Sequence, residues 1–168
     1  MEVLPDIAGD APQVVFCGMA GAENACTRDH YYETPGNELW LCLHQSGFTP
    51  RLRPEDDHRL VEHGLAMTDL VRHRDPEWYE VDALAEKVRA WEPEWLAFTS
   101  KTVAAVVARH LGHRRPGLGV AGWDLAGAPV YVLPGMSGAN RRRDYDGRPT
   151  RLEWWVDLAQ LCGRSGPA

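Results

Sequence analysis

Short runs of apolar residues recur along the chain and predict a series of strands. Residues 13–17 are mainly β-branched or aromatic and end at Gly18, which is typical of a strand buried on both faces. The loop that follows is expected to continue to about residue 36. Further strands are predicted at residues 65–71, 95–99, 118–123 and 129–133.

Between these strands, apolar residues recur at intervals of three and four, which is the spacing of one helix face. Asn37 and Ser100 are expected to cap two of the helices, because their side-chain oxygens can accept hydrogen bonds from free backbone N–H groups. Residues 72–78 are polar and contain a proline, so a surface loop is expected there. The predicted helices lie between Asn37 and Gly47, between Pro54 and Gly64, from Val81 to about Pro93, from Ser100 to Leu111, and from Arg151 to Leu161.

This alternation predicts an α/β fold, a three-layer αβα sandwich with a mainly parallel central sheet and right-handed crossovers. A chain of 168 residues suits one domain, here residues 1–168 with a core of about 13–162. The segments that follow strands are expected to meet at one edge of the sheet, where α/β proteins place their sites.

Composition fits a soluble globular protein, since 44% of residues are hydrophobic and 25% are charged. No apolar run approaches the roughly 20 residues that cross a bilayer. Residues 1–10 contain three acidic residues and no basic residue before a short apolar run, unlike a secretory signal. We therefore expect a cytoplasmic protein, with no membrane contact.

The cysteines and histidines give little support for a metal site. Cys17, Cys26, Cys42 and Cys162 include no C-x-x-C pair, so reduced thiols are expected rather than zinc or iron-sulfur ligands. His110 and His113 lie near a predicted helix end without a suitably spaced third ligand. Neither a metal nor another cofactor is expected.

Charge is unevenly distributed along the chain. A formal net charge of −6 would ordinarily count against a nucleic-acid binder. Residues 141–151, however, contain five arginines and two aspartates beside a Gly/Ser segment, a pattern that could grip DNA phosphates or could be a plain solvated patch. Ser100 and Lys101, at a predicted helix start, could add a phosphate contact.

Several short motifs, in order and spacing, resemble those of one family. They are Gly18-Met19-Ala20-Gly21-Ala22; Tyr31, Tyr32, Pro35, Asn37 and Trp40; Gln45, Gly47, Phe48 and Thr49; Gly64, Thr68, Leu70 and Val71; and Val132, Leu133, Pro134, Ser137 and Gly138. Over roughly residues 13–161 the chain resembles the mismatch-specific uracil/thymine branch of the uracil-DNA glycosylase superfamily.

The resemblance implies an αβα enzyme that flips a deaminated base out of DNA and hydrolyses its N-glycosidic bond. It places the base against the backbone of the first motif and stacks it on Tyr32, although Tyr32 could instead be a core aromatic. A later loop would wedge into the DNA, with three arginines beside it. The implied base-binding residues are Gly18, Met19, Ala20, Gly21, Ala22 and Tyr32, and the implied DNA-binding residues are Ser137, Gly138, Ala139, Asn140, Arg141, Arg142 and Arg143.

The first motif departs from the family pattern at the position that usually holds a water-orienting Asn. Ala20 stands there, and Gly21 replaces the usual proline. An anionic or water-positioning group must then come from elsewhere, because cleavage builds positive charge on the sugar and negative charge on the departing base. Asp69 is the first candidate and also a possible reader of the base, unless it only caps a turn. Glu23 and Asn24 are the second candidates, unless they are solvated loop residues.

The leading hypothesis is a monofunctional uracil-DNA glycosylase that acts as a monomer on DNA containing uracil or a related deaminated base. A non-cleaving protein of the same fold, binding damaged bases or DNA, is the alternative suggested by Ala20 and by Gly135 in the wedge motif. An enzyme acting on free nucleosides is a third reading, disfavoured by the arginine cluster.

Overall fold

The computed structural model describes residues 3–21, 28–74, 77–136 and 144–164. A six-stranded sheet has the order β3-β2-β1-β4-β6-β5. The strands are β1 (Val14–Ala20), β2 (Leu65–Arg74), β3 (Glu77–Tyr79), β4 (Trp95–Phe98), β5 (Gly119–Leu125) and β6 (Ala128–Val132).

The sheet is mixed, so the prediction of a mainly parallel sheet is wrong. β1 pairs in parallel with β2 and β4, and β4 with β6, but β2–β3 and β5–β6 are antiparallel. Within the segment predicted as a loop at 72–78, residues 72–74 are instead the end of β2, and residues 77–78 belong to β3. The β5–β6 connection is a two-residue turn at Ala126 and Gly127, both with positive φ, which joins antiparallel strands. Short connections at both edges of the sheet therefore limit its parallel part to the centre.

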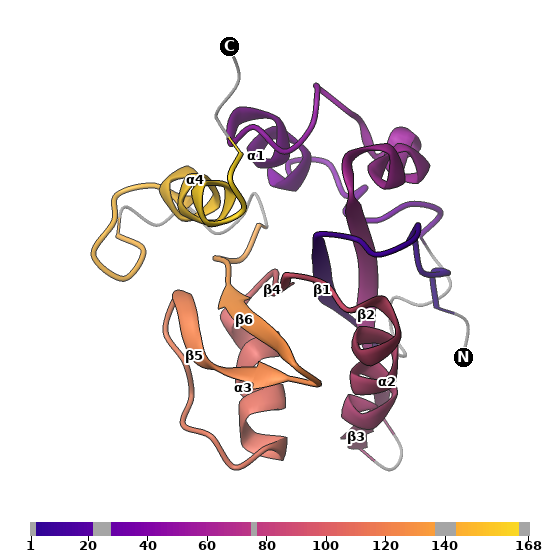
Figure 1. Ribbon diagram of the computed structural model, residues 1–168, viewed down its shortest axis with the longest axis vertical. Helices are drawn as coiled ribbons and strands as arrows, with labels where there is room; N and C mark the ends of the chain where they lie inside the picture. Colours follow the sequence, from indigo (N-terminus) through magenta and orange to yellow (C-terminus); the bar gives the residue numbers. More distant parts are fainter. Residues whose placement is uncertain (1–2, 22–27, 75–76, 137–143, 165–168) are drawn as a thin grey trace.

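Helices cover both faces of the sheet, as the alternation predicts (Figure 1). Val14 and Phe16 of β1 pack into one apolar cluster with α1 (Leu39–Gln45) and α4 (Arg151–Leu161). Val15 and Cys17 face the other cluster, with α2 (Val81–Trp91) and α3 (Lys101–His110). β1 is buried on both sides, and this explains its continuous apolar run.

Local signals placed some helix ends correctly and others only approximately. Ser100 caps α3 as predicted, with its hydroxyl accepting a hydrogen bond from the Val103 N–H at 3.3 Å. Asn37 is not the N-cap of α1: it accepts from the Leu39 N–H at 3.0 Å, while Glu38 occupies the cap position. Residues 54–63 form the 3₁₀ helix η1 (Pro54–His63), which ends at Gly64 with φ 70°.

The carboxyl ends of the central strands meet at one edge of the sheet. Gly18 lies opposite Asp69 in the β1–β2 register. The Thr99 N–H, just after β4, donates to the Cys17 carbonyl at 3.0 Å. Three strands therefore bring Gly18, Asp69 and Thr99 together. Within the described ranges, no helix is both long and apolar enough to cross a membrane.

Candidate active site

Gly18 lies at the centre of a small group of polar side chains. A Cβ atom on Gly18 would lie 2.6 Å from the Tyr32 hydroxyl, 2.9 Å from Asp69 Oδ1 and 3.4 Å from Thr99 Oγ1. The first two distances are shorter than any ordinary carbon–oxygen contact. Only a glycine therefore lets these side chains come so close to β1.

Tyr32 is fixed in this group by its hydroxyl. Its oxygen lies 2.8 Å from Thr99 Oγ1, and Thr99 Oγ1 in turn donates to the Cys17 carbonyl at 3.3 Å. The Tyr32 hydroxyl is therefore the donor to Thr99. Burial and the nearby Asp69 charge raise the pKa of Tyr32, so the phenol stays neutral. The Tyr32 backbone has φ 52°, a conformation that few side chains adopt without local support.

Tyr31, the preceding residue, belongs to the core. It is 1% exposed, and its hydroxyl donates to the Pro5 carbonyl at 3.1 Å. Its N–H donates to Asp57, and its carbonyl accepts from the Trp40 indole. Adjacent tyrosines thus point in different directions, and Tyr32 is the one near Gly18.

Asp69 is buried and forms an ion pair. Its side chain is 4% exposed, and Arg28 Nη2 lies 3.0 Å from Oδ2. Burial raises the pKa of Asp69, although the Arg28 guanidinium opposes that shift. Among the residues that the structure describes, no backbone N–H bonds to this carboxylate, which argues against a simple turn cap. Sequence reasoning missed Arg28, and its only signal there was a basic residue in the loop after β1.

The amino-terminal segment contacts the residues of β2 that precede Asp69. Thr68, the neighbour of Asp69, donates to Asp6 Oδ1 at 2.6 Å, and Lys87 Nζ lies 3.0 Å from Asp6 Oδ2. Ile7 forms an antiparallel bridge with Met67. This Asp6–Thr68–Lys87 network was also missed, because it joins three distant parts of the chain.

The first motif is more strand than loop. β1 continues to Ala20, so Gly18, Met19 and Ala20 pair with β2, and the prediction of a loop starting at Gly18 is wrong. The parallel ladder with β2 extends beyond the apolar run that marked the strand in the sequence. Ala20 is fully buried and Met19 is half-buried against the α2–α3 side. Gly21 ends this described stretch, with open space where a Cβ would lie.

Ten of the predicted site residues belong to the segments 22–27 and 137–143. They lie outside the described residues: Ala22, Glu23, Asn24, Ser137, Gly138, Ala139, Asn140, Arg141, Arg142 and Arg143. Two further arginines of the cluster contact other side chains of the protein. The guanidinium carbon of Arg148 lies 3.8 Å from the centre of the Trp154 ring, and Nη1 of the buried Arg151 lies 2.6 Å from Glu38 Oε2.

Ser100 and Lys101 line a cavity of about 460 Å³ at the start of α3. Its wall includes Pro134 and Gly135, which lead into the predicted wedge loop, and Arg115. Lys101 Nζ lies 2.5 Å from Asp146 Oδ1. The Ser100 hydroxyl already caps α3, and Lys101 is already paired with Asp146. A phosphate bound in this cavity would therefore have to compete with Asp146 for Lys101.

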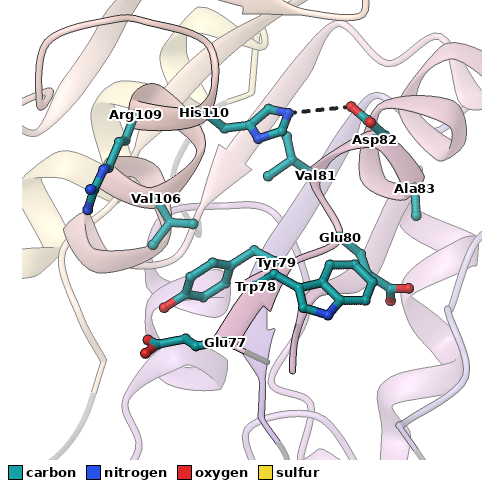
Figure 2. Close-up of a pocket in the computed structure, with 10 residues that line it drawn as sticks. All are labelled: Glu77, Trp78, Tyr79, Glu80, Val81, Asp82, Ala83, Val106, Arg109 and His110. Carbon is teal, nitrogen blue, oxygen red and sulfur yellow. Dashed lines mark ion pairs between the residues drawn. The ribbon is translucent and has the colours of Figure 1, made fainter. Parts of the chain in front are cut away.

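A larger cavity of about 950 Å³ lies elsewhere, between β3 and the helices α2 and α3. Figure 2 shows Trp78, Tyr79 and Val106 around it and the His110–Asp82 pair at 3.5 Å. None of the predicted site residues lines this larger cavity. The volume of a cavity alone therefore does not identify the active site.

Metal ligands do not gather in the described part of the chain, where no three His, Cys, Asp or Glu side chains could share an ion. His113, which lies near His110 in the sequence, stacks on Trp123 with ring centres 4.9 Å apart.

Comparison with known proteins agrees with this architecture. The model of the uracil DNA glycosylase superfamily matches residues 5–159. The solution NMR structure of a candidate uracil DNA glycosylase from Methanosarcina acetivorans superimposes with a TM-score of 0.61, over 97% of this chain and 98% of that chain, at 15% sequence identity. Such low identity shows a shared fold alone. The family match covers nearly the whole chain, and the chain therefore belongs to the uracil DNA glycosylase superfamily.

Proposed function

We propose that this protein is a monofunctional DNA glycosylase that hydrolyses the N-glycosidic bond of uracil, or of a related deaminated base, in DNA. The observation that carries the proposal is the group of Tyr32, Asp69 and Thr99 around Gly18, at the sheet edge of a member of this superfamily. The group combines an aromatic ring, a buried carboxylate and hydroxyl groups, which are the functions that this reaction uses.

The target base must leave the stack, because its glycosidic bond is unreachable inside a duplex. Tyr32 is proposed to stack on the flipped base, and the backbone of residues 18–22 to contact its edge. Hydrolysis breaks the bond between the base nitrogen and C1′, while a water oxygen bonds to C1′. The electron pair leaves with the base, and the proton lost by the water is available to the base anion.

The carboxylate of Asp69 is the described group best able to assist this reaction. An anion near the sugar stabilises the positive charge that develops there, and a carboxylate can also orient water. Ala20 can do neither, because its side chain is a buried methyl group. Glu23 and Asn24 keep their place as second candidates for orienting the water.

DNA binding is proposed to use Ser100, Lys101 and the wedge segment 137–143. The cavity at the start of α3 is lined by Pro134 and Gly135, which precede that segment in the chain. A backbone phosphate would bring enough negative charge to compete with Asp146 for Lys101. We also propose a cytoplasmic monomer, and a closer relation to the mismatch-specific branch.

Two observations favour the second candidate function, a non-cleaving protein that binds damaged bases. Ala20 replaces the usual water-orienting residue, and Arg28 occupies one oxygen of the Asp69 carboxylate. Both would weaken catalysis more than they would weaken base binding.

Oligonucleotides carrying one uracil, hypoxanthine or mismatched thymine test the proposal, in single strands and in duplexes. Alkali cleaves DNA at abasic sites, so strand scission after incubation reports glycosylase activity. We expect scission at uracil and a loss of about 100-fold or more in Asp69→Asn. Binding without scission on any of these substrates would favour the non-cleaving protein. Glu23→Gln and Asn24→Ala then show whether either residue orients water.

A further inference from the structure

The two oxygens of the Asp69 carboxylate face different neighbours. Oδ2 accepts a hydrogen bond from Arg28 Nη2 at 3.0 Å. Oδ1 lies toward Gly18, 2.9 Å from where a Cβ would be, on the side of the Tyr32 hydroxyl. One oxygen is thus engaged by Arg28, and the other faces the site where the proposed function places the base.

Arg28 retains unused donors. Its side chain is 18% exposed, and its Nε is buried without a hydrogen-bond partner in the described structure. A buried guanidinium N–H without an acceptor is costly, unless a ligand supplies one. The Arg28–Asp69 ion pair therefore retains an acceptor, Asp69 Oδ1, and a guanidinium donor without a partner in the described structure.

We propose that Arg28 is a base-reading residue, which donates to a carbonyl oxygen of the flipped base while Asp69 accepts from the adjacent ring N–H. This inference rests on the proposed function. Uracil has this edge at N3–H and O4, and hypoxanthine at N1–H and O6. An aspartate alone can accept but cannot donate, so Arg28 supplies the half of the recognition that Asp69 lacks.

The same pair rejects the two bases from which uracil and hypoxanthine arise by deamination. Cytosine and adenine present a ring nitrogen acceptor beside an amino group, which reverses the pattern. The Asp69 carboxylate would then face a lone pair, and Arg28 would face an amino donor. Sites built to hydrogen-bond one pattern reject its reverse strongly, because their buried groups are left unpaired.

Arg28 also keeps Asp69 in the form that this reading needs. Burial favours the protonated acid, and the guanidinium favours the carboxylate that accepts from a ring N–H. Replacing Arg28 should therefore change base selectivity as well as overall affinity.

Equilibrium binding to duplexes tests the inference without requiring turnover. The duplexes carry one 2′-fluoro-deoxyuridine or one 2′-fluoro-deoxycytidine, whose glycosidic bonds resist cleavage, and the uracil-to-cytosine affinity ratio is the readout. We expect a ratio of about 100 or more for the wild type, and a ratio reduced about 10-fold or more in Arg28→Met. Arg28→Lys, which keeps a charge and a donor, should restore part of the ratio.

Arg72→Met is the matched control, because Arg72 forms an exposed pair with Glu77 at the edge of the sheet. It should bind with the wild-type ratio. A wild-type ratio in both Arg28→Met and Arg28→Lys would overturn the role of Arg28 and leave the proposed function standing. If the wild type itself showed no preference for uracil over cytosine, the proposed function and this inference would fail together. Should Arg28→Met not fold, the uracil-to-cytosine affinity ratio of Arg28→Lys is compared with that of the wild type. A lower ratio supports the role of Arg28, and an equal ratio overturns it.

Discussion

The Tyr32 hydroxyl and Thr99 Oγ1 lie 2.8 Å apart, and this hydrogen bond ties the loop after β1 to the end of β4. The two residues are 67 positions apart in the chain. The contact holds the Tyr32 ring beside Gly18 and Asp69, so the arrangement of the site depends on tertiary structure rather than on local sequence.

Replacing Gly18 by Ala should reduce activity more than stability. The new methyl group would displace the Tyr32 hydroxyl and Asp69 Oδ1, which are ends of side chains that can move without unfolding the sheet. A displacement of about 1 Å in a site can cost about 100-fold in rate, and we expect a loss of about that size. Gly9→Ala is the control, since a Cβ there would lie 3.5 Å from the nearest atom of Val61, an ordinary contact distance. Equal activity in Gly18→Ala and the wild type would show that this crowding is unimportant.

Tyr32→Phe and Tyr32→Ala should separate anchoring from stacking. Phe keeps the ring and loses one hydrogen bond, so we expect a loss of about 1 kcal/mol in unfolding free energy and nearly unchanged binding of uracil DNA. Ala also removes the ring, and should weaken binding by a further ~1–3 kcal/mol. Chemical denaturation and fluorescence anisotropy measure the two quantities. Wild-type DNA affinity in Tyr32→Ala would exclude stacking.

Asp69 should make the protein less stable as pH rises. Its pKa is raised in the folded state, so the folded protein binds this proton more tightly than the unfolded chain does. Its contribution to stability is therefore complete below the ordinary aspartate pKa and is lost as pH rises through the raised pKa. Asp69→Asn has no titrating group at this position. Its free energy of unfolding should therefore rise relative to that of the wild type as pH increases from the ordinary aspartate pKa through the raised pKa.

Urea unfolding at a series of pH values measures this difference. Asp124→Asn, at an exposed position of β5, is the control and should run parallel to the wild type. A difference between Asp69→Asn and the wild type that does not change with pH would show that Asp69 has the same pKa in both states.

Gly119→Ala should destabilise the fold. Gly119 has φ 93°, and a Cβ there would lie 2.9 Å from Cζ3 of Trp154, a bulky ring held by a hydrogen bond from its indole to the Tyr145 carbonyl. We expect a loss of ~1–3 kcal/mol and a lower melting temperature. Gly122→Ala has a similar φ of 85° but no atom within 4 Å, so it isolates the backbone strain. Equal melting temperatures in the two variants would mean that Trp154 moves aside freely.

Lys101→Met and Arg142→Met should weaken DNA binding and reduce its dependence on salt. Each phosphate contact contributes about 0.9 to the slope of log affinity against log salt concentration. We expect each variant to lower the slope by about that amount for every DNA sequence tested. Arg59→Met, on the exposed face of η1, is the control. A wild-type slope in both variants would remove these residues from the DNA interface.

The sequence predicted those features that depend on neighbouring residues. Ser100 caps α3 because its hydroxyl needs only the backbone three residues ahead. Asp69 was proposed as a site residue from the sequence, and it lies within β2, opposite Gly18. Arg28 was not expected to pair with it, because 41 residues separate the two and only the assembled sheet brings them together.

The errors have similar physical causes. The segment 72–78 has the polarity of a loop, yet residues 72–74 and 77–78 pair in the antiparallel β2–β3 ladder at the sheet edge. Residues 18–20 contain a glycine that is typical of a loop, and the ladder with β2 keeps them in a strand. In both cases, pairing with another strand outweighs the local preference of the residues.

The segment containing Pro5, Asp6 and Ile7 holds two parts of the site at once. The Pro5 carbonyl accepts a hydrogen bond from the hydroxyl of Tyr31, which precedes Tyr32. The Asp6 carboxylate accepts one from the hydroxyl of Thr68, which precedes Asp69. The two proposed base contacts consequently share one support outside the site. Loosening that support would release the ring and the carboxylate together, so mild denaturant should abolish base recognition while the central sheet is still intact.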